Sequence, residues 1–472
     1  MVMQMVADSP VLDAEAVQRL RERLAGELIL PSDGAYDAAR KVWNSAYSRY
    51  PALVVRAHDA ADVLQAVRFA RREGLPLSVR SGGHSMAGHG AVEGGLMLNL
   101  SAMKGLSVDP ERRVAWAQPG VTAGEYGAKA QEHGLATPFG DVGSVGIAGL
   151  TLGGGIGYLA RKHGLAIDNL LSADVVTADG RLLTASETEH PDLFWALRGG
   201  GGNFGVVTGL EYRLRPVGMI VGGALFHEAS AQALLNLYRV ASAAPEELTT
   251  IAFVLQAPPL PFIPAEKVGS LVLMTTFCYA GDVEAGMAAL APLKEIGTPV
   301  AEVVQPMPYT GLYQLTADGA ASRPHTIRTG FASWLDRRMA EAIMAHARGF
   351  VSPFGAVQLR VLGGAMSRVP AGATAFAHRD KSLMLNIWGA WDTPGEASRN
   401  VAWLERAWRD LGPMTDGAYV NFLENEGRRR VRDAYPTLTR QRLEAIKGRY
   451  DPTNFFRINQ NIRPAGQREL VS

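Results

Sequence analysis

A histidine in a glycine-rich loop is the most chemically suggestive residue of the sequence. Residues 80–85 read RSGGHS and follow the short apolar run 77–79, which is typical of a buried strand. An imidazole can act as a nucleophile, a base or a metal ligand, and glycines let a ligand come close to the backbone. We therefore expect His84 to meet a ligand at the end of a strand. His89, which also lies between glycines, is interpreted as a loop residue.

Two loops could bind an anion through their backbone N–H groups. Successive N–H groups in a turn form an anion-binding nest, and residues 80–85 and 142–149 (VGSVGIAG) each follow the end of a strand or helix. Together they could hold one pyrophosphate, although each could also be an ordinary tight loop. Eight of the eighteen residues from 140 to 157 are glycine and most others are apolar, unlike a flexible linker. Such a backbone suits close contact with a large, flat group.

Several other kinds of site are not indicated. Residues 200–205 (GGGNFG) match G-x-G-x-x-G, but the expected helix precedes this loop and the expected strand follows it, the reverse of a Rossmann site. No P-loop pattern occurs. His84, His89, His133 and His163 lack the spacing of zinc ligands, so we expect no metal site. GSVG at 143–146 misses the G-x-S-x-G pattern of a serine hydrolase.

Strand and helix patterns alternate in the first half of the chain. Residues 53–55 and 77–79 read as buried strands on either side of a helix capped by Asp59 and ended by Gly74. Beyond the histidine loop we expect strands within 96–117, a helix between Thr122 and Gly134, a hairpin turning at 179–180, a helix at 192–198 and a strand from 206.

The pattern of residue types in the sequence changes near Pro216. Glycine clusters stop, and strand-like runs at 219–226, 249–256, 270–281, 356–365 and 382–391 are separated by helical stretches at 230–241 and 337–349. This pattern predicts an α+β fold in which helices cover one face of an antiparallel sheet. From residue 440 the chain returns to a helix followed by turn residues. We expect a discontinuous domain of residues 1–217 and 426–472 that encloses a second domain of residues 218–425.

The composition indicates an ordinary globular protein and does not favour nucleic acid as its main partner. Basic and acidic residues number 47 and 46, and no basic stripe occurs, which argues against nucleic acid. No apolar run is long enough to cross a membrane. Asp8, Asp13 and Glu15 fit a helix that begins near residues 9–10 rather than a signal peptide, so we expect a cytoplasmic protein. The single cysteine, Cys278, is expected to pack in the core.

Five motifs resemble, in order, those of one enzyme family. They are SVRSGGHS (78–85), VGIAGLTLGGGIGYLARKHGLAIDNL (145–170), RGGGGNFGVVT (198–208), GAYVNF (417–422) and YDPTNFFRINQNI (450–462). Over residues 40–464 the chain resembles the berberine-bridge-enzyme-like branch of the vanillyl-alcohol-oxidase superfamily, which has a PCMH-type FAD-binding domain. The resemblance implies a two-domain FAD-linked oxidoreductase in which an antiparallel sheet, covered by helices, forms the substrate domain.

By this resemblance His84 matches the histidine bonded to the 8α-methyl carbon of FAD. A neutral imidazole is the competent nucleophile for that bond. Many relatives form a second flavin bond through a cysteine, but Val142 stands at the matching position, which implies single attachment. The implied cofactor-binding residues are Arg80, Ser81, Gly82, Gly83, Ser85, Val142, Gly143, Ser144, Val145, Gly146, Ile147, Gly149, Gly153, Gly154, Gly155, Gly205, Val206, Val207, Asn421, Asn459 and Asn461.

The resemblance also implies an oxidase that transfers a substrate hydride to flavin N5. In plant members, a small valine at the position of Val145 leaves dioxygen a path to the flavin, which favours hydrogen peroxide as product over a dehydrogenase that uses another acceptor. A catalytically silent flavin-binding protein is a further alternative. Tyr419 matches the family's base, although a phenol needs a lowered pKa for this and could instead be a packed aromatic. Asn421 is expected on the same strand face as Tyr419.

The sequence does not define the substrate or the oligomeric state. Small alcohols, sugars, phenolic compounds and amines all fit hydride loss beside a heteroatom. Gln358 and Arg360 share one face of the expected strand at 356–361, where they would contact substrate if that face lines the cleft, or solvent if it is an outer face. Asn386 and Trp388 are further candidate substrate contacts.

Overall fold

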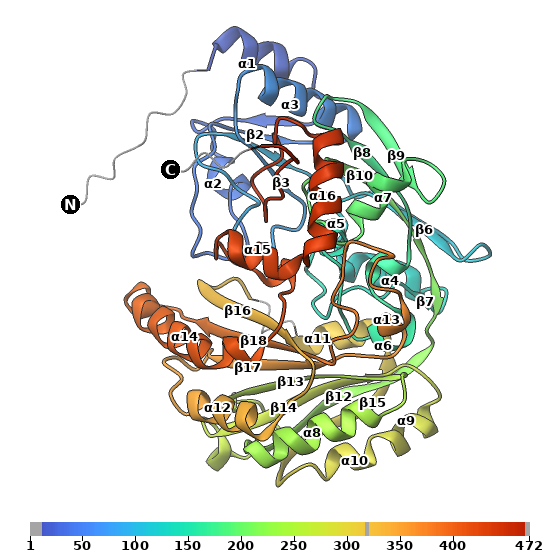
Figure 1. The fold of residues 1–472 in the computed structure, drawn as a ribbon, viewed down its shortest axis with the longest axis vertical. Coiled ribbons are helices and arrows are strands. Elements are labelled where there is room, and N and C mark those ends of the chain that lie inside the picture. The colour runs from blue at the N-terminus through green and yellow to red at the C-terminus, as the bar shows by residue number, and fades with distance from the viewer. Residues whose placement is uncertain (1–11, 317–320, 468–472) are drawn as a thin grey trace.

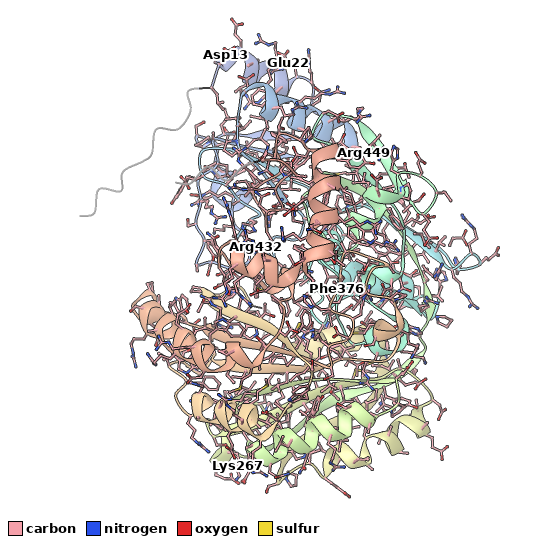
Figure 2. The ribbon with its side chains drawn as sticks, viewed as in Figure 1. Asp13, Glu22, Lys267, Phe376, Arg432 and Arg449 are labelled. Carbon is pink, nitrogen blue, oxygen red and sulfur yellow. The ribbon has the colours of Figure 1, made fainter. Side chains whose placement is uncertain are left out.

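The computed structural model describes residues 12–316 and 321–467, which form two stacked parts (Figure 1). The upper part holds the N-terminal half of the chain together with helices α15 (Arg428–Ala434) and α16 (Thr437–Tyr450) from its C-terminal end. The lower part holds one large sheet. Figure 2 shows Phe376 and Arg432 near the level at which the two parts meet, and Lys267 at the far end of the lower part. The domain limits at 217 and 425 stay a prediction.

The first sheet of the upper part ends in the histidine loop. Its strand order is β1 (Glu27–Ile29), β2 (Leu53–Arg56), β4 (Leu96–Asn99) and β3 (Leu77–Arg80), and the last three strands are parallel. Helix α3 (Ala60–Arg72) joins β2 to β3. Asp59 caps this helix by accepting hydrogen bonds from two N–H groups, and Gly74, at φ +66°, follows its end. The predicted strand, helix and caps are therefore confirmed.

The N-terminal helix α1 (Ala14–Arg21) is capped by Asp13. The expected start of this helix, at residues 9–10, lies outside the described residues. A short helix α2 (Tyr36–Ala39) follows β1.

The second sheet is antiparallel and carries the glycine-rich stretches on its connections. Its strands, in order, are β5 (Leu106–Asp109), β6 (Val114–Ala117), β10 (Val206–Arg213), β8 (Leu170–Val176) and β9 (Leu182–Ser186). Helices α4 (Ala123–Gln131), α5 (Ile147–Leu152), α6 (Ala160–His163) and α7 (Pro191–Leu197) lie on the connections between its strands. Thr122 forms a capping box at the start of α4, where the sequence predicts a helix. A small ladder pairs β7 (Leu135–Ala136) with β11 (Arg215–Pro216).

The lower part is built on a seven-stranded antiparallel sheet. Its order is β15 (Pro299–Pro308), β12 (Met219–Glu228), β14 (Leu271–Tyr279), β13 (Leu248–Gln256), β17 (Ala356–Val361), β18 (Leu383–Ala390) and β16 (His325–Ala332). The sequence analysis missed β15 and β16, which are the two edge strands. Most of β15 is partly or fully exposed and carries three prolines, so it lacks the apolar run of a central strand.

Helices cover one face of this sheet, as predicted. Helices α8 (Ala231–Ala243), α12 (Arg337–Ala347) and α14 (Ala397–Leu411) form a core with Val357, Leu359 and Val361 of β17. Shorter helices α9 (Val283–Ala289), α10 (Ala291–Lys294), α11 (Leu312–Thr316) and α13 (Ala365–Arg368) fill the connections. The opposite face of the sheet turns toward the upper part (Figure 1).

Three further observations bear on possible chemistry. Cys278 of β14 is fully buried, as predicted, and burial raises the pKa of its thiol. Within residues 12–316 and 321–467, no helix combines the length and apolar character needed to cross a membrane. In the same residues no group of three or more His, Cys, Asp or Glu side chains is arranged to bind a metal ion.

Candidate functional site

The two predicted anion-binding loops touch each other. Strand β3 ends at Arg80, and the chain then passes directly against the loop that leads into α5. A Cβ built on Gly82 would lie 2.4 Å from the Gly146 nitrogen, and one built on Gly146 would lie 2.5 Å from the Gly82 nitrogen. Neither position has room for a side chain. The glycines therefore allow the backbone that follows β3 and the backbone that leads into α5 to pack directly on each other.

The histidine loop presents a row of free backbone donors. The N–H groups of Gly82, Gly83, His84 and Ser85 have no acceptor in the part of the chain that the structure describes. The Gly83 carbonyl accepts a hydrogen bond of 3.0 Å from the Trp43 N–H, which fixes the loop, and Gly83 itself adopts φ +76°. Such a row of N–H groups forms a nest that binds an anion.

Arg80 adds an unpaired positive charge beside this nest. Its Nε is buried without a partner, and its guanidinium makes no hydrogen bond or ion pair with the described residues. Burial lowers the pKa of Arg80, because the charged form is removed from water without compensation. A phosphate would supply the missing countercharge. The donor set therefore fits the pyrophosphate of a dinucleotide.

The His84 side chain is held as a neutral imidazole. Its ring is stacked on the Trp43 indole, with 4.8 Å between the centroids and 22° between the planes. Burial, then the charges of Arg80 and His325, lower the pKa of His84 to about 4, and a hydrogen bond with the Ser144 backbone opposes this shift. At neutral pH one ring nitrogen of His84 therefore keeps its lone pair, which is the nucleophilic form. Ser144 belongs to the second loop, so the His84 side chain links the first loop to the second.

The other residues of these loops surround the same surface. Ser81 donates to the Pro119 carbonyl, and Ser85 accepts a 3.3 Å hydrogen bond from the His89 N–H. Gly146 and Ile147 are buried at the start of α5. The remaining members, which are at least partly exposed beside Gly82, are Val142, Gly143, Ser144, Val145 and Gly149.

A cavity of about 540 Å³ lies between the segment 89–93 and the C-terminal tail. Asn459 and Asn461 line it, and the Oδ1 atom of each is buried without a partner. His89 also lines this cavity, and burial lowers its pKa to about 4. The volume falls within the range of ordinary ligand sites. The two asparagines therefore offer free acceptors, as residues that contact a ligand would.

The C-terminal tail is joined to the loop at residues 199–205. Asn459 Nδ2 donates to the Gly202 carbonyl at 3.0 Å, while Asn203 donates to the Gln460 carbonyl at 3.1 Å and accepts from the Ile462 N–H at 2.9 Å. Gly205 packs against β8, where a Cβ would lie 2.3 Å from Val175. Val206 and Val207 follow as buried residues of β10. Motifs 250 residues apart are thus adjacent in space.

The glycine stretch at 153–155 contacts the segment that contains Tyr419. A Cβ on Gly153 would lie 2.1 Å from Asn421 Oδ1, and one on Gly154 would lie 3.2 Å from the Tyr419 ring. The Gly155 N–H donates to the Tyr419 hydroxyl at 3.0 Å. The glycines at 153–155 therefore pack directly on Tyr419, the candidate base.

The Tyr419 side chain is almost completely buried, and its hydroxyl group is already hydrogen-bonded. Only 3% of the residue is exposed, and its hydroxyl oxygen also accepts a 3.0 Å hydrogen bond from Asn421 Nδ2. Burial raises the pKa of Tyr419, while the N–H groups of Gly155 and Asn421 and the charge of Arg360 lower it in part. The net effect raises the pKa of Tyr419 above that of an ordinary tyrosine, so the phenol keeps its proton at neutral pH.

The prediction of a strand that carries both Tyr419 and Asn421 is wrong. Tyr419 precedes a short 3-10 helix, η7 (Val420–Phe422), and Asn421 reaches the tyrosine through that turn rather than along a strand face. Asn421 Nδ2 also donates to the Leu150 carbonyl at 2.9 Å. The segment is too short and too irregular for the alternation that the sequence analysis assumed.

A row of rings connects His84 to Tyr419. Each neighbouring pair has centroids 4.7–6.2 Å apart, in the order His84, Trp43, His325, Trp388, Phe422 and Tyr419. Trp43, His325 and Phe422 were not predicted as site residues. Trp43 and His325 come from segments that no local pattern marks, whereas Phe422 ends the motif at 417–422. The row of rings joins the upper part to the sheet of the lower part.

Gln358 and Arg360 face the upper part and not solvent. Their exposed fractions are 3% and 4%, which excludes the outer-face alternative. Arg360 forms a bidentate ion pair with Asp141, at 2.9 and 3.0 Å. Gln358 Oε1 accepts from Arg360 Nε at 3.0 Å and from Asn386 Nδ2 at 2.7 Å, while Asn386 Oδ1 is buried without a partner. Contact of these residues with substrate stays a prediction.

Comparisons with known proteins agree with this arrangement. Residues 51–186 match the family model described as "FAD binding domain", and residues 418–463 match "Berberine and berberine like". The chain is 32% identical over 463 residues to (R)-6-hydroxynicotine oxidase of Paenarthrobacter nicotinovorans, covering 94% of this chain and 98% of that protein. It is 30% identical over 454 residues to the uncharacterized FAD-linked oxidoreductase YgaK of Bacillus subtilis, with the same coverage. The crystal structure of 6-hydroxy-D-nicotine oxidase from Arthrobacter nicotinovorans superposes with a TM-score of 0.83 at 30% identity, covering 93% and 98% of the two chains.

Proposed function

Because the chain belongs to the berberine-bridge-enzyme-like family of FAD-linked oxidoreductases, we propose that it is an oxidase with FAD covalently bound to His84 and dioxygen as electron acceptor. When bound, the flavin takes a hydride from a substrate carbon and returns the electron pair to dioxygen as hydrogen peroxide. The protein supplies binding, orientation and proton transfer.

One observation carries this proposal: the neutral imidazole of His84 stands next to four free N–H groups and an unpaired arginine. The nest at residues 82–85, with Arg80, suits the pyrophosphate, and a ring nitrogen of His84 is available for the bond to the 8α carbon. Val142 cannot form the second bond that a cysteine would form. Asn459 and Asn461 offer free acceptors to the N–H groups of the cofactor.

Tyr419 is the candidate acceptor for a substrate proton. Two N–H groups, from Gly155 and Asn421, donate to its oxygen and would stabilise the phenolate. Because burial raises the pKa of Tyr419, the phenol is protonated at neutral pH, and the phenolate becomes more populated as the pH rises. An alcohol, which must lose a proton as its hydride leaves, should therefore react faster at alkaline pH. An amine that binds as the free base has a lone pair to stabilise the developing charge and does not need this step.

The side chains of Trp388, Phe422 and Asn386 support a small substrate with an apolar or aromatic body. Trp388 and Phe422 supply ring faces, with 6.2 Å between their centroids, and Asn386 Oδ1 supplies a free acceptor for an O–H or N–H group. The relative named for 6-hydroxynicotine supports testing amines beside alcohols, sugars and phenolic compounds.

The experiment mixes the oxidised holoenzyme with each substrate class without oxygen and follows loss of flavin absorbance. Dioxygen is then added, and hydrogen peroxide is measured against reoxidation by an artificial acceptor. We expect at least one class to bleach the flavin and dioxygen to restore it. Reoxidation by the artificial acceptor alone would favour a dehydrogenase, and no bleaching by any class would favour a silent flavin-binding protein.

Val145 gives a sharper test of the acceptor. It is partly exposed on the loop that touches Gly82. Val145→Leu adds bulk and should slow reoxidation by dioxygen while leaving reduction by substrate unchanged. An unchanged rate of reoxidation would remove the proposed oxygen path.

A further inference from the structure

Arg360 has a different environment from a substrate-binding arginine. Four of its N–H groups donate to protein acceptors: Nε to Gln358, Nη1 to both Asp141 and the Ile156 carbonyl, and Nη2 to Asp141. A guanidinium has five N–H donors, so one remains. Only 4% of Arg360 is exposed. The guanidinium is therefore already occupied by the protein.

The acceptors of Arg360 belong to the segments proposed to meet the flavin. Asp141 directly precedes the loop at 142–147, and its own carbonyl is held by the Thr316 hydroxyl at 2.8 Å. Ile156 follows the glycine stretch at 153–155, which packs on Tyr419. The guanidinium carbon also lies 5.4 Å from the centre of the Phe422 ring. One side chain thus joins three such segments to strand β17.

The rest of the network extends across the sheet. Gln358 accepts from Arg360, and Asn386 of the next strand donates to the same oxygen of Gln358 at 2.7 Å. Gln358 and Asn386 are direct partners in the register of β17 and β18. Asp141 is therefore connected to Asn386 through the side chains of Arg360 and Gln358.

We propose that Arg360 is a positioning residue that fixes the 141–147 loop and the 153–156 backbone for the flavin, rather than a residue that contacts substrate. Its two parallel N–H···O bonds to Asp141 set both the distance and the orientation of the loop, which a single point charge does not do. The proposal rests on the proposed function, because it concerns the same flavin site.

A second ion pair provides a matched control. Arg379 forms a bidentate pair with Asp168, with both bonds at 2.7 Å, and the two side chains are 3% and 9% exposed. This pair also joins the upper and lower parts. The other acceptors of Arg379 are Met366, Thr374 and Phe376, and none belongs to the loops at 80–85 or 141–147. Asp168 ends a turn whose Ala166 and Ile167 N–H groups donate to the carbonyls of residues 155 and 154, so this pair supports the 153–155 backbone but not the 141–147 loop. Loss of either pair should therefore cost similar stability, but loss of the Arg360 pair should reduce flavin binding more.

The test compares Arg360→Lys and Asp141→Asn with Arg379→Lys. Each full-length protein is produced with excess riboflavin, and total and covalent flavin per chain, the absorption maximum of the bound flavin, and the thermal midpoint are measured. We expect Arg360→Lys and Asp141→Asn to lower the covalent flavin per chain about tenfold, the size of effect that loss of an orienting outer contact has at metal sites, and to shift the absorption maximum. Arg379→Lys, which leaves the 141–147 loop held, should retain clearly more flavin per chain than Arg360→Lys even where its thermal midpoint falls equally.

Three results would overturn the proposal. Wild-type flavin content in either Arg360→Lys or Asp141→Asn would remove the positioning role. A raised KM alone, with the spectrum unchanged, would make Arg360 a substrate contact. Equal flavin loss in Arg379→Lys would show general destabilisation. If the wild-type chain itself carries no covalent flavin, the proposed linkage fails, and the positioning role is then decided by titrating FAD into the flavin-free proteins.

Discussion

His84 and Trp43 are stacked, with 4.8 Å between their ring centroids and 22° between their planes. The same loop is tied to Trp43 by a hydrogen bond from its N–H to the Gly83 carbonyl. The indole therefore fixes both the backbone and the ring of the residue that we propose to bond the flavin. Trp43 comes from a segment 41 positions earlier in the chain, so this relationship exists only in the folded protein.

Replacing Trp43 tests the importance of this support. Trp43→Ala removes the stacking surface and should lower the covalent share of the bound flavin, because the His84 ring is no longer held in one orientation. Trp43→Phe keeps a ring and should retain most of the linkage. The covalent share is measured as flavin that remains with the acid-precipitated protein. A normal covalent share in Trp43→Ala would show that the stacking is dispensable.

The contact between Gly82 and Gly146 predicts a strict size limit. Gly82→Ala places a methyl group 2.4 Å from the Gly146 nitrogen, so the loops must separate, at a cost of about 1–3 kcal/mol in the free energy of unfolding. FAD incorporation should fall as well, since the nest is distorted. Denaturant unfolding and flavin content measure the two effects. Gly34→Ala, where no atom lies within 4 Å, is the control. Equal unfolding curves for Gly82→Ala and Gly34→Ala would contradict the contact.

The raised pKa of Tyr419 predicts an alkaline rise in rate. Between pH 7 and 10 the phenol is mostly protonated, so the phenolate fraction, and with it the rate of flavin reduction by an alcohol, should increase about tenfold per pH unit. Tyr419→Phe should abolish that rise and lower the rate at high pH. Anaerobic stopped-flow measurement of flavin reduction gives both profiles. A flat wild-type profile with a reactive alcohol would exclude Tyr419 as the proton acceptor.

His325 predicts that acid destabilises the protein. Burial lowers the pKa of His325 to about 4 from an ordinary value of 6.5, so between these pH values the unfolded chain binds more protons than the folded one. Stability should therefore fall as the pH drops from 6.5 to 4, and this residue contributes up to about 3 kcal/mol of the loss.

The control for that prediction is His325→Gln. The variant cannot titrate in this range, so the difference between its unfolding free energy and that of the wild type should shrink as the pH falls from 7 to 4. Chemical denaturation at several pH values measures this difference. A constant difference across the range would show that His325 is not buried in its neutral form.

Much of the fold follows from local patterns in the sequence. The caps at Asp59 and Thr122 and the apolar runs of the central strands mark their elements, because each depends on residues close in the chain. The edge strands β15 and β16 escaped prediction because neither has a long apolar run: β15 carries three prolines, and half of the residues of β16 are His, Thr or Arg. The short 3-10 helix after Tyr419 escaped it because three residues carry no periodicity.

The candidate site was predictable only where a motif is continuous. The loops around His84 and Gly146 are recognisable from their glycines. The residues that contact these loops are not recognisable in the same way. Trp43 stacks on His84, His325 packs on Trp43, and Asp141 pairs with Arg360 only in the folded chain. Arg360 shows the difference most clearly. Its strand face was predicted, but its ion pair with Asp141 joins two residues that are 219 positions apart in the chain.

The mass of the intact, denatured chain tests the central proposal most directly. Protein produced with plentiful riboflavin should carry the added mass of one FAD, and His84→Ala should have the mass of its bare chain while His89→Ala keeps the addition. A wild-type chain at its unmodified mass, or an addition that survives in His84→Ala, would contradict covalent attachment at His84.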